Sequence, residues 1–185
     1  MHLTASPAVW YAARAAGIVA YLLLSTSVVL GLALAGKERL DRWPRFALED
    51  VHRFAGILAG IFVGVHVLAI AIDSYVPFSL AALVVPFAAS YRPLFTALGV
   101  VAAELLVALA IGNRLRRRIS HRLWRRLHYL NFAVWAGATL HGLGSGTDRG
   151  TPWLVAIYIW VTGAVVLLVA RRISRAPAAA RTPSA

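Results

Sequence analysis

The chain has 185 residues, of which 60% are hydrophobic, whereas a typical soluble domain is about 45–50% apolar. It contains no cysteine, which excludes disulfides, thiolate-ligated haem, c-type haem attachment and iron–sulfur clusters. The formal net charge of +12 comes from 19 Lys and Arg residues against 7 Asp and Glu residues. These cations gather beside apolar runs, so we attribute them to membrane orientation and anionic lipid, and we predict no nucleic-acid partner.

Five long runs with almost no charged residue follow one another along the chain: 15–36, 54–72, 93–113 (interrupted only by Glu104), 127–147 and 150–170. Crossing the hydrocarbon core takes about 20 apolar residues, and helices satisfy their own backbone there. We therefore predict an all-α integral membrane protein. It is a bundle of five transmembrane helices in one domain over residues 1–175, with a disordered tail at 176–185. The first run is longer than the apolar segment of a signal peptide, and only Arg14 precedes it where a signal peptide would have a basic segment. We therefore expect this helix to be retained in the protein.

Basic residues are distributed unevenly between the two ends of these runs. Most of them follow the first, third and fifth runs, and only Arg14, Arg92 and Arg149 belong to the other side. Because cytoplasmic loops carry the excess of Lys and Arg, we predict an outside N-terminus and a cytoplasmic C-terminus in a bacterial-type plasma membrane. The outer loop 73–92 holds an apolar stretch that is too short to span, which we expect to be interfacial or re-entrant.

Four histidines lie within or at the edge of two of the apolar runs: His52, His66, His128 and His141. An ionisable residue inside the membrane is a functional hypothesis by default. His52 and His66 are 14 residues apart, about 21 Å along a helix and only about 40° apart in direction. His128 and His141 are 13 apart, which turns an ideal helix by about 220°. We expect either a kink or overwinding near Gly137, or two cofactors offset around the helix.

The two histidine-bearing helices are predicted to run in the same direction through the membrane. His52 and His128 then lie at one level near the cytoplasmic face, and His66 and His141 lie at a second level near the outer face. One histidine from each of two facing helices, at each of two levels, is the layout for two cofactors held inside a bundle.

Haem fits this ligand set better than zinc does. Zinc takes four closely gathered ligands, and no Asp, Glu or Cys stands beside these histidines. Haem needs only two axial ligands, so bis-histidine b-type haem is the favoured cofactor. Gly56, Gly60 and Gly64 offer room for a macrocycle, although the same spacing also serves plain helix packing.

The pattern His-x13-His and His-x12-His on two transmembrane helices, with "WRRLHYL" at residues 124–130, resembles the ferric reductase-like transmembrane domain superfamily. That group includes ferric reductases, NADPH oxidases and the haem-binding subunit of the periplasmic methionine sulfoxide reductase system. The resemblance spans roughly residues 15–170. It implies that His52 and His128 ligate an inner haem, that His66 and His141 ligate an outer haem, and that electrons pass from the cytoplasm to the outer face.

The chain departs from the larger members of that group, which usually carry a sixth helix and a cytoplasmic FAD/NAD(P)H domain. We expect no nucleotide-binding domain here. The donor is then a separate flavoprotein, a quinol, or a loosely bound flavin (FMN or FAD). The acceptor at the outer face is a protein or a metal, so "ferric" names the family and not a substrate.

Several other residues are candidates for a role beside haem, each with a plainer alternative. Arg53 and Arg125 are candidate partners of inner-haem propionates or simple interfacial anchors, and Arg14 and Arg92 are candidates at the outer haem. Trp135 lies between the two histidines of its run and is a candidate inter-haem residue or a packing residue. Glu104 in the third run either serves a proton path or haem edge, or is a neutral structural acid. We expect His121 to be a solvated loop residue.

The leading hypothesis is a membrane di-haem b-type cytochrome that passes electrons from a cytoplasmic or membrane donor to an outer-face acceptor. It would act as the electron-transfer subunit of an oxidoreductase. A stand-alone metalloreductase or quinol-linked reductase is the first alternative. A histidine-based proton or metal transporter is the second.

Overall fold

The computed structural model describes residues 7–36, 43–74 and 77–174. Within these ranges every regular element is a helix, which confirms the all-α prediction. The helices in chain order are α1 (Ala8–Ala35), α2 (Arg45–Ile72), α3 (Leu80–Val84), α4 (Pro93–Arg114), α5 (His121–His128), α6 (Asn131–Ser145) and α7 (Pro152–Ser174). The tail predicted to be disordered lies outside the described residues, as do Lys37, Arg39 and Arg42 of the first basic loop.

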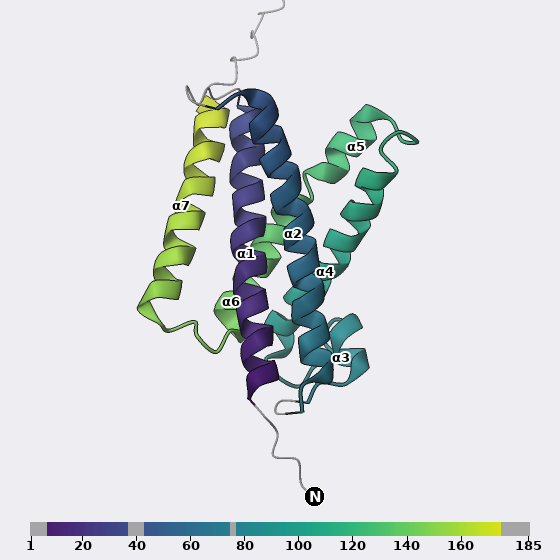
Figure 1. Cartoon of the computed structure of the whole chain (residues 1–185), viewed down its shortest axis with the longest axis vertical. Coiled ribbons are helices and arrows are strands. Elements are labelled where there is room, and N and C mark those ends of the chain that lie inside the picture. Colours follow the sequence, from purple (N-terminus) through teal and green to yellow (C-terminus); the bar gives the residue numbers. More distant parts are fainter. Residues whose placement is uncertain (1–6, 37–42, 75–76, 175–185) are drawn as a thin grey trace, which may run out of the picture.

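Four helices, α1, α2, α4 and α7, are long and apolar enough to cross a membrane. The long axes of these helices run roughly along the vertical of Figure 1, with α1 (purple) and α2 side by side and α7 (yellow) beside α1. Helix α4 packs mainly on α6. We call the end where α1 and α7 finish and α2 begins the arginine-rich end, and the opposite end, which holds α3, the α3 end. The chain is a multi-pass membrane protein.

The fourth predicted span is two helices and not one. Helix α5 ends at His128, Tyr129 and Leu130 form a turn, and α6 starts at Asn131. Figure 1 shows α5 leaning away from the bundle at the arginine-rich end while α6 continues inside it. At 15 residues, α6 covers about 22 Å, which is shorter than the other four long helices.

The break also corrects the position expected for a kink. Gly137 lies in the middle of the continuous helix α6, where a Cβ would stand 3.3 Å from the Ala102 Cβ on α4. It therefore serves close packing of α6 on α4. The turn instead carries hydrogen bonds from Leu130 N to Leu127 O (2.9 Å) and from Phe132 N to Tyr129 O (3.1 Å). Such i→i−3 bonds wind the chain more tightly than an α-helix does, and the change of axis removes the 220° constraint.

Helices α1 and α2 begin earlier than their apolar runs, at Ala8 and Arg45. Helix α2 starts at Arg45, directly after Pro44, and its first turns are polar. Arg45 Nε donates to Glu49 Oε1 at 3.0 Å, an i,i+4 pair that supports this exposed start. Helix α4 begins with Pro93 at its first position, as its sequence predicts. The short α3 lies in the outer loop and is capped by Ser79 Oγ, which accepts from Ala82 N at 3.2 Å.

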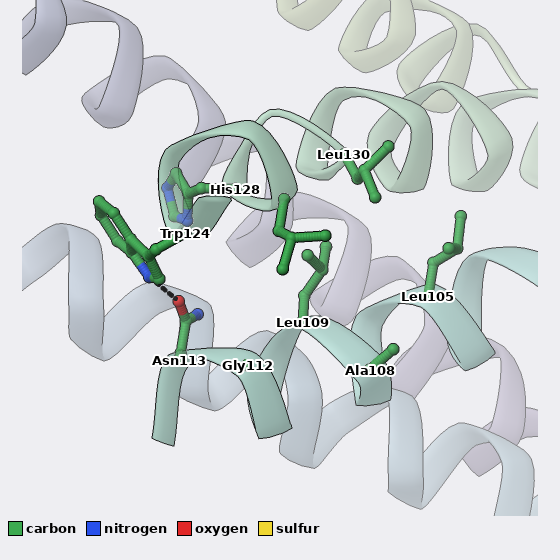
Figure 2. A pocket seen from close by; sticks show the side chains of 9 residues that line it. Leu105, Ala108, Leu109, Gly112, Asn113, Trp124, His128 and Leu130 are labelled. Atoms are coloured by element: carbon green, nitrogen blue, oxygen red, sulfur yellow. Dashed lines mark hydrogen bonds between the residues drawn. The ribbon is translucent and has the colours of Figure 1, made fainter. Parts of the chain in front are cut away.

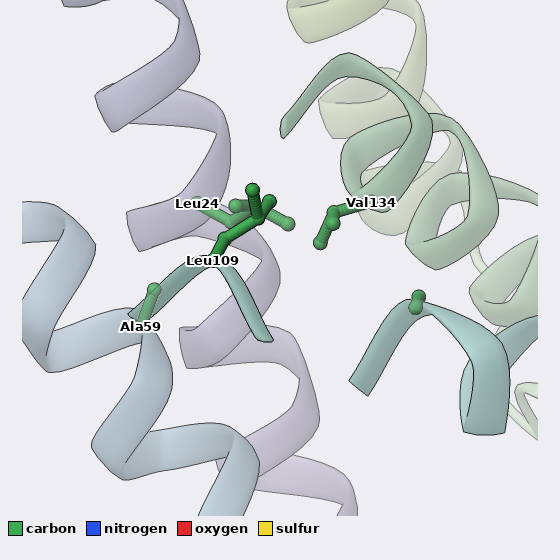
Figure 3. Packing of buried hydrophobic residues seen from close by; sticks show 5 residues of the cluster. Leu24, Ala59, Leu109 and Val134 are labelled. Atoms are coloured by element: carbon green, nitrogen blue, oxygen red, sulfur yellow. The ribbon is translucent and has the colours of Figure 1, made fainter. Parts of the chain in front are cut away.

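The core of the bundle is a small aliphatic cluster at mid-depth. Its buried members come from α1, α2, α4 and α6: Leu24, Ala59, Ala102, Leu109 and Val134. Figure 3 shows Leu24 and Val134 pointing toward one another from facing helices, with Leu109 between them in the view. Large apolar side chains elsewhere face outward, among them Trp160 of α7, which is 79% exposed, as lipid-facing residues would be.

Candidate cofactor site formed by two histidine pairs

The structure brings the four predicted histidines together in the two predicted pairs. The ring centroids of His52 (α2) and His128 (end of α5) are 6.1 Å apart, with ring planes at 74°. The centroids of His66 (α2) and His141 (α6) are 6.3 Å apart, with planes at 76°. We call the first the inner pair, at the arginine-rich end, and the second the outer pair, at the α3 end. All four side chains are half-buried.

Three of the four imidazoles are held by a backbone carbonyl of a neighbouring helix. Nδ1 lies 2.8 Å from Ser27 O in His52, 2.7 Å from Ala13 O in His66 and 2.9 Å from Phe95 O in His141. A carbonyl oxygen only accepts, so each Nδ1 carries the hydrogen and donates it. The other nitrogen, Nε2, then keeps its lone pair, which is the tautomer that binds a metal.

Each of these three rings also lies over a glycine. A Cβ at Gly31 would stand 3.2 Å from His52 Cε1, one at Gly17 3.0 Å from His66 Nδ1, and one at Gly99 2.5 Å from His141 Nδ1. In every case the accepting carbonyl belongs to the residue four positions before the glycine. We call each combination of a glycine and its carbonyl a glycine notch. A Cβ in place of the glycine hydrogen would press on the imidazole at all three positions, and most strongly at Gly99.

Sequence reasoning missed these glycines, although the sequence carries a sign of them. Gly17 and Gly31 are 14 residues apart, as are His52 and His66 on the antiparallel helix α2. Equal spacing on two antiparallel helices places the matching residues opposite one another. That match between α1 and α2 would have pointed to the notches.

His128 is held differently from the other three. Its Nδ1 lies 3.4 Å from Asn131 Nδ2, and the same amide donates to His128 O at 2.7 Å, across the turn that joins α5 to α6. The indole of Trp124 stacks on the His128 ring, with centroids 5.0 Å apart and planes at 24°. The position on α4 that matches Gly99 is Gly112, 13 residues later, and a Cβ there would meet nothing within 4 Å.

One cavity borders both residues of the outer pair, and a second borders His128 of the inner pair. His66 and His141 line a cavity of about 230 Å³ between α1, α2, α4 and α6, whose walls are mostly apolar. Its polar lining lies toward the α3 end and includes Arg14, Thr96, Ser145 and Asp148. His128 lines a smaller cavity of about 70 Å³ between α4 and α5, with Trp124, Asn113 and Gly112. Figure 2 shows Trp124 and His128 on one side of this cavity, facing Asn113 and Gly112 of α4.

The two candidate arginines at the outer haem, Arg14 and Arg92, each bond to other groups of the protein. Arg14 forms an ion pair with Asp148 of the α6–α7 turn, including an Nε–Oδ2 hydrogen bond of 2.9 Å, and lines the outer cavity. The Arg92 guanidinium donates to Gly144 O near the end of α6, and Arg149 donates to the same oxygen at 3.1 Å. Arg92 therefore caps α6, and of the two candidates it is Arg14 that borders the outer pair's cavity.

The inner arginines lie at the surface of the arginine-rich end. Arg53 is exposed and stands 4.0 Å from Asp50, one turn earlier on α2. Arg125 is exposed on α5. Neither side chain is buried in the bundle. Both therefore stay candidate partners of haem propionates, and anchoring at the membrane surface stays the alternative role.

Trp135 is placed at the junction of α1, α6 and α7. Its Nε1 donates to Ser25 Oγ at 3.2 Å, and the ring packs against buried residues of three clusters. Glu104 is exposed on α4. His121, expected in a loop, is instead the first residue of helix α5, because Ser120 Oγ caps that helix by accepting from Leu123 N at 3.3 Å.

Within the described residues, no three side chains of His, Cys, Asp or Glu converge on a point where a metal ion could sit. From this residue set, each pair therefore offers two imidazole nitrogens as candidate ligands. The chemistry available at each level is the binding of a group that brings its remaining ligands with it.

Comparison with known proteins identifies the family of the chain. Residues 16–139 match the family model described as "Ferric reductase like transmembrane component". The match covers most of the chain and includes His52, His66 and His128, and it ends just before His141. No curated protein and no solved structure matches the chain. The chain belongs to the ferric reductase-like transmembrane family, whose members are oxidoreductase-related electron-transfer components of membranes.

Proposed function

We propose that this protein is a di-haem b-type membrane cytochrome. It passes electrons from a cytoplasmic or membrane donor to an acceptor at the outer face, as the electron-transfer subunit of an oxidoreductase. The observation that carries the proposal is that the four histidines form two pairs at two levels, and in each pair the ring centroids are just over 6 Å apart. The proposal extends the family assignment, which by itself supports only a transmembrane electron-transfer component.

The distance within each pair fits two axial ligands on one iron. A metal–imidazole bond is about 2.0–2.1 Å, and the ring centre lies about 1 Å beyond the nitrogen, so two opposite imidazoles have centroids roughly 6 Å apart. The notches at Gly31, Gly17 and Gly99 support this by fixing the tautomer with a free Nε2. When bound, the haems supply one-electron redox chemistry at two levels of the membrane.

The protein's own residues hold and separate the two levels. Ser27 O, Ala13 O and Phe95 O orient the imidazoles, and the aliphatic cluster around Val134 keeps water out of the space between the pairs. Arg14 lines the outer cavity and would be the residue to hold a propionate of the outer haem; in the structure it is paired with Asp148. Arg53 and Arg125 are available on the other side.

The orientation follows from charge. We place the arginine-rich end in the cytoplasm and count α5 with α6 as a fifth crossing, in a bacterial-type plasma membrane. The donor at that end is a flavoprotein, a quinol or a bound flavin (FMN or FAD), and the acceptor at the α3 end is a protein or a metal.

The absorption spectrum and haem content of the purified protein test the proposal. We expect a b-type reduced-minus-oxidised spectrum and two haems per chain by pyridine haemochrome. Replacing His66 or His141 with Leu should remove one haem and leave the other, and His121→Leu, an exposed histidine on α5, is the matched control with no loss. A colourless protein that carries protons or divalent metal across vesicles would overturn the proposal in favour of a transporter. Turnover with quinol or reduced flavin by the protein alone would instead assign it a stand-alone reductase activity.

A further inference from the structure

Three aromatic rings stack along one face of α5. The His121 and Trp124 rings have centroids 5.6 Å apart with planes at 28°, and the Trp124 and His128 rings follow at 5.0 Å and 24°. The three residues are spaced i, i+3 and i+7, which puts them on one side of a helix. The stack ends on a residue of the inner pair.

The indole in the middle of this stack is fixed from both sides. Trp124 Nε1 donates to Asn113 Oδ1 of α4 at 2.9 Å, while its faces contact the two imidazoles. Figure 2 shows this hydrogen bond on the side of the cavity near the end of α4. A tryptophan that served only as an interfacial anchor would need no contact with a cofactor ligand.

The stack leads from the inner pair to the surface. His121 is exposed, Trp124 is half-buried, and His128 lies beside His52 in the bundle. Arg122, Arg125 and Arg126 are exposed on the same short helix, which contains no acidic residue. Within the described residues, no other aromatic ring stacks on His66 or His141 of the outer pair. Among the described residues, a stack of rings from the surface to a histidine pair is therefore found at the inner pair and not at the outer pair.

We propose that Trp124 is the electron-input residue of this protein, and that it couples an anionic one-electron reductant at the surface of α5 to the inner pair through the His128 ring. The proposal rests on the proposed function, since it needs an iron at that pair. The reductant loses one electron and the inner ferric iron gains it; no bond forms or breaks, and Trp124 itself is unchanged at the end. The arginines of α5 attract the reductant, so its approach slows as salt is added.

The test uses the full haem-loaded chain in sealed vesicles, with titanium(III) citrate added outside as an anionic one-electron reductant. The chain has no cysteine, so a Ser174→Cys variant at the exposed end of α7 reports by thiol labelling which vesicles show the arginine-rich end outward. We compare the wild type with Trp124→Leu, Trp124→Phe and Trp160→Leu, the last a lipid-exposed tryptophan on α7 as matched control.

We expect Trp124→Leu to slow haem reduction from the arginine-rich side several-fold, Trp124→Phe to restore most of the rate, and Trp160→Leu to match the wild type. Haem content and the rate of oxidation from the opposite side should stay unchanged, whereas a merely structural role of the indole would lower the haem content. The midpoint potential of the inner haem is measured in each variant, and the slower reduction should exceed what any shift of that potential accounts for. A wild-type rate in Trp124→Leu overturns the proposal. So does loss of the inner haem in that variant, because it would assign the indole to packing. A wild-type chain that binds no haem at His52 and His128 overturns the proposed function itself.

Discussion

The inner and outer histidine pairs have nearly the same separation but are built in different ways. At the outer pair both imidazoles, His66 and His141, lie in glycine notches on continuous helices. At the inner pair only His52 does. His128 ends a short helix that leans out of the bundle, where Asn131 bonds to it across the turn and the Trp124 ring stacks on it. The outer pair is thus fixed by backbone, whereas half of the inner pair is fixed by side chains that can be changed one at a time.

The strongest test of this difference compares two glycines of α4. A Cβ at Gly99 would stand 2.5 Å from His141 Nδ1, so Gly99→Ala should displace that ring and abolish haem binding at the outer pair. Gly112→Ala, at the matching position beside His128, meets open space and should leave both haems in place. Haem content and the low-spin signals in electron paramagnetic resonance measure both outcomes. Equal loss in the two variants would contradict the comparison.

The side-chain support of His128 is tested at Asn131. Asn131→Leu removes the amide beside Nδ1 and its bond to His128 O across the turn. The amide can only donate, so it does not hold an Nδ1–H tautomer as a carbonyl does, and it fixes the His128 ring through the turn. We therefore expect its loss to weaken haem binding at the inner pair by up to about 10-fold, the lower end of the range for an outer-shell partner of a metal ligand. Titration of the apo-protein with haem would measure it, with the outer pair as internal reference. A similar fall at both pairs would show that Asn131 acts on the whole bundle.

The two notches on α1 should respond more mildly and in a fixed order. A Cβ would stand 3.0 Å from the His66 ring at Gly17 and 3.2 Å from the His52 ring at Gly31, and each neighbour is a side chain that can shift a few tenths of an ångström. We expect Gly17→Ala and Gly31→Ala to keep both haems, while each moves the resonance signal of its own pair, Gly17→Ala by the larger amount. Gly163→Ala on α7, where a Cβ meets nothing within 4 Å, is the control. A shift at the wrong pair would refute the assignment of notches to levels.

The smallest effect concerns the ion pair at the α3 end. Arg14 and Asp148 join the start of α1 to the α6–α7 turn and are partly exposed. A double-mutant cycle with Arg14→Ala and Asp148→Ala should give a coupling free energy of about 1 kcal/mol or less. Thermal unfolding in detergent would measure it in the apo-protein. If bound haem removes the coupling, Arg14 has exchanged Asp148 for a propionate.

The sequence was sufficient to predict the four histidines and their pairing, because a 14-residue spacing on one helix and two helices of like direction place them at two levels. The sequence did not locate the helix break at Tyr129 and Leu130, since neither residue is a glycine or proline. The 13-residue spacing showed only that the segment could not be one ideal helix with both histidines on the same face. The start of α2 at Arg45 was missed because apolar runs report membrane depth and not helix length. The notches were missed because they depend on how α1 and α4 pack against other helices.

The matched spacing of Gly17 with Gly31 and of His52 with His66 couples the lengths of two helices. Inserting one residue between the glycines would turn the far end of α1 by about 100° and shift it by about 1.5 Å, so one of the two carbonyl acceptors would be lost. Insertions and deletions in this part of α1 should therefore survive during evolution only with a compensating change in α2. Among related chains, the distance between these glycines and the distance between the α2 histidines should vary together or not at all.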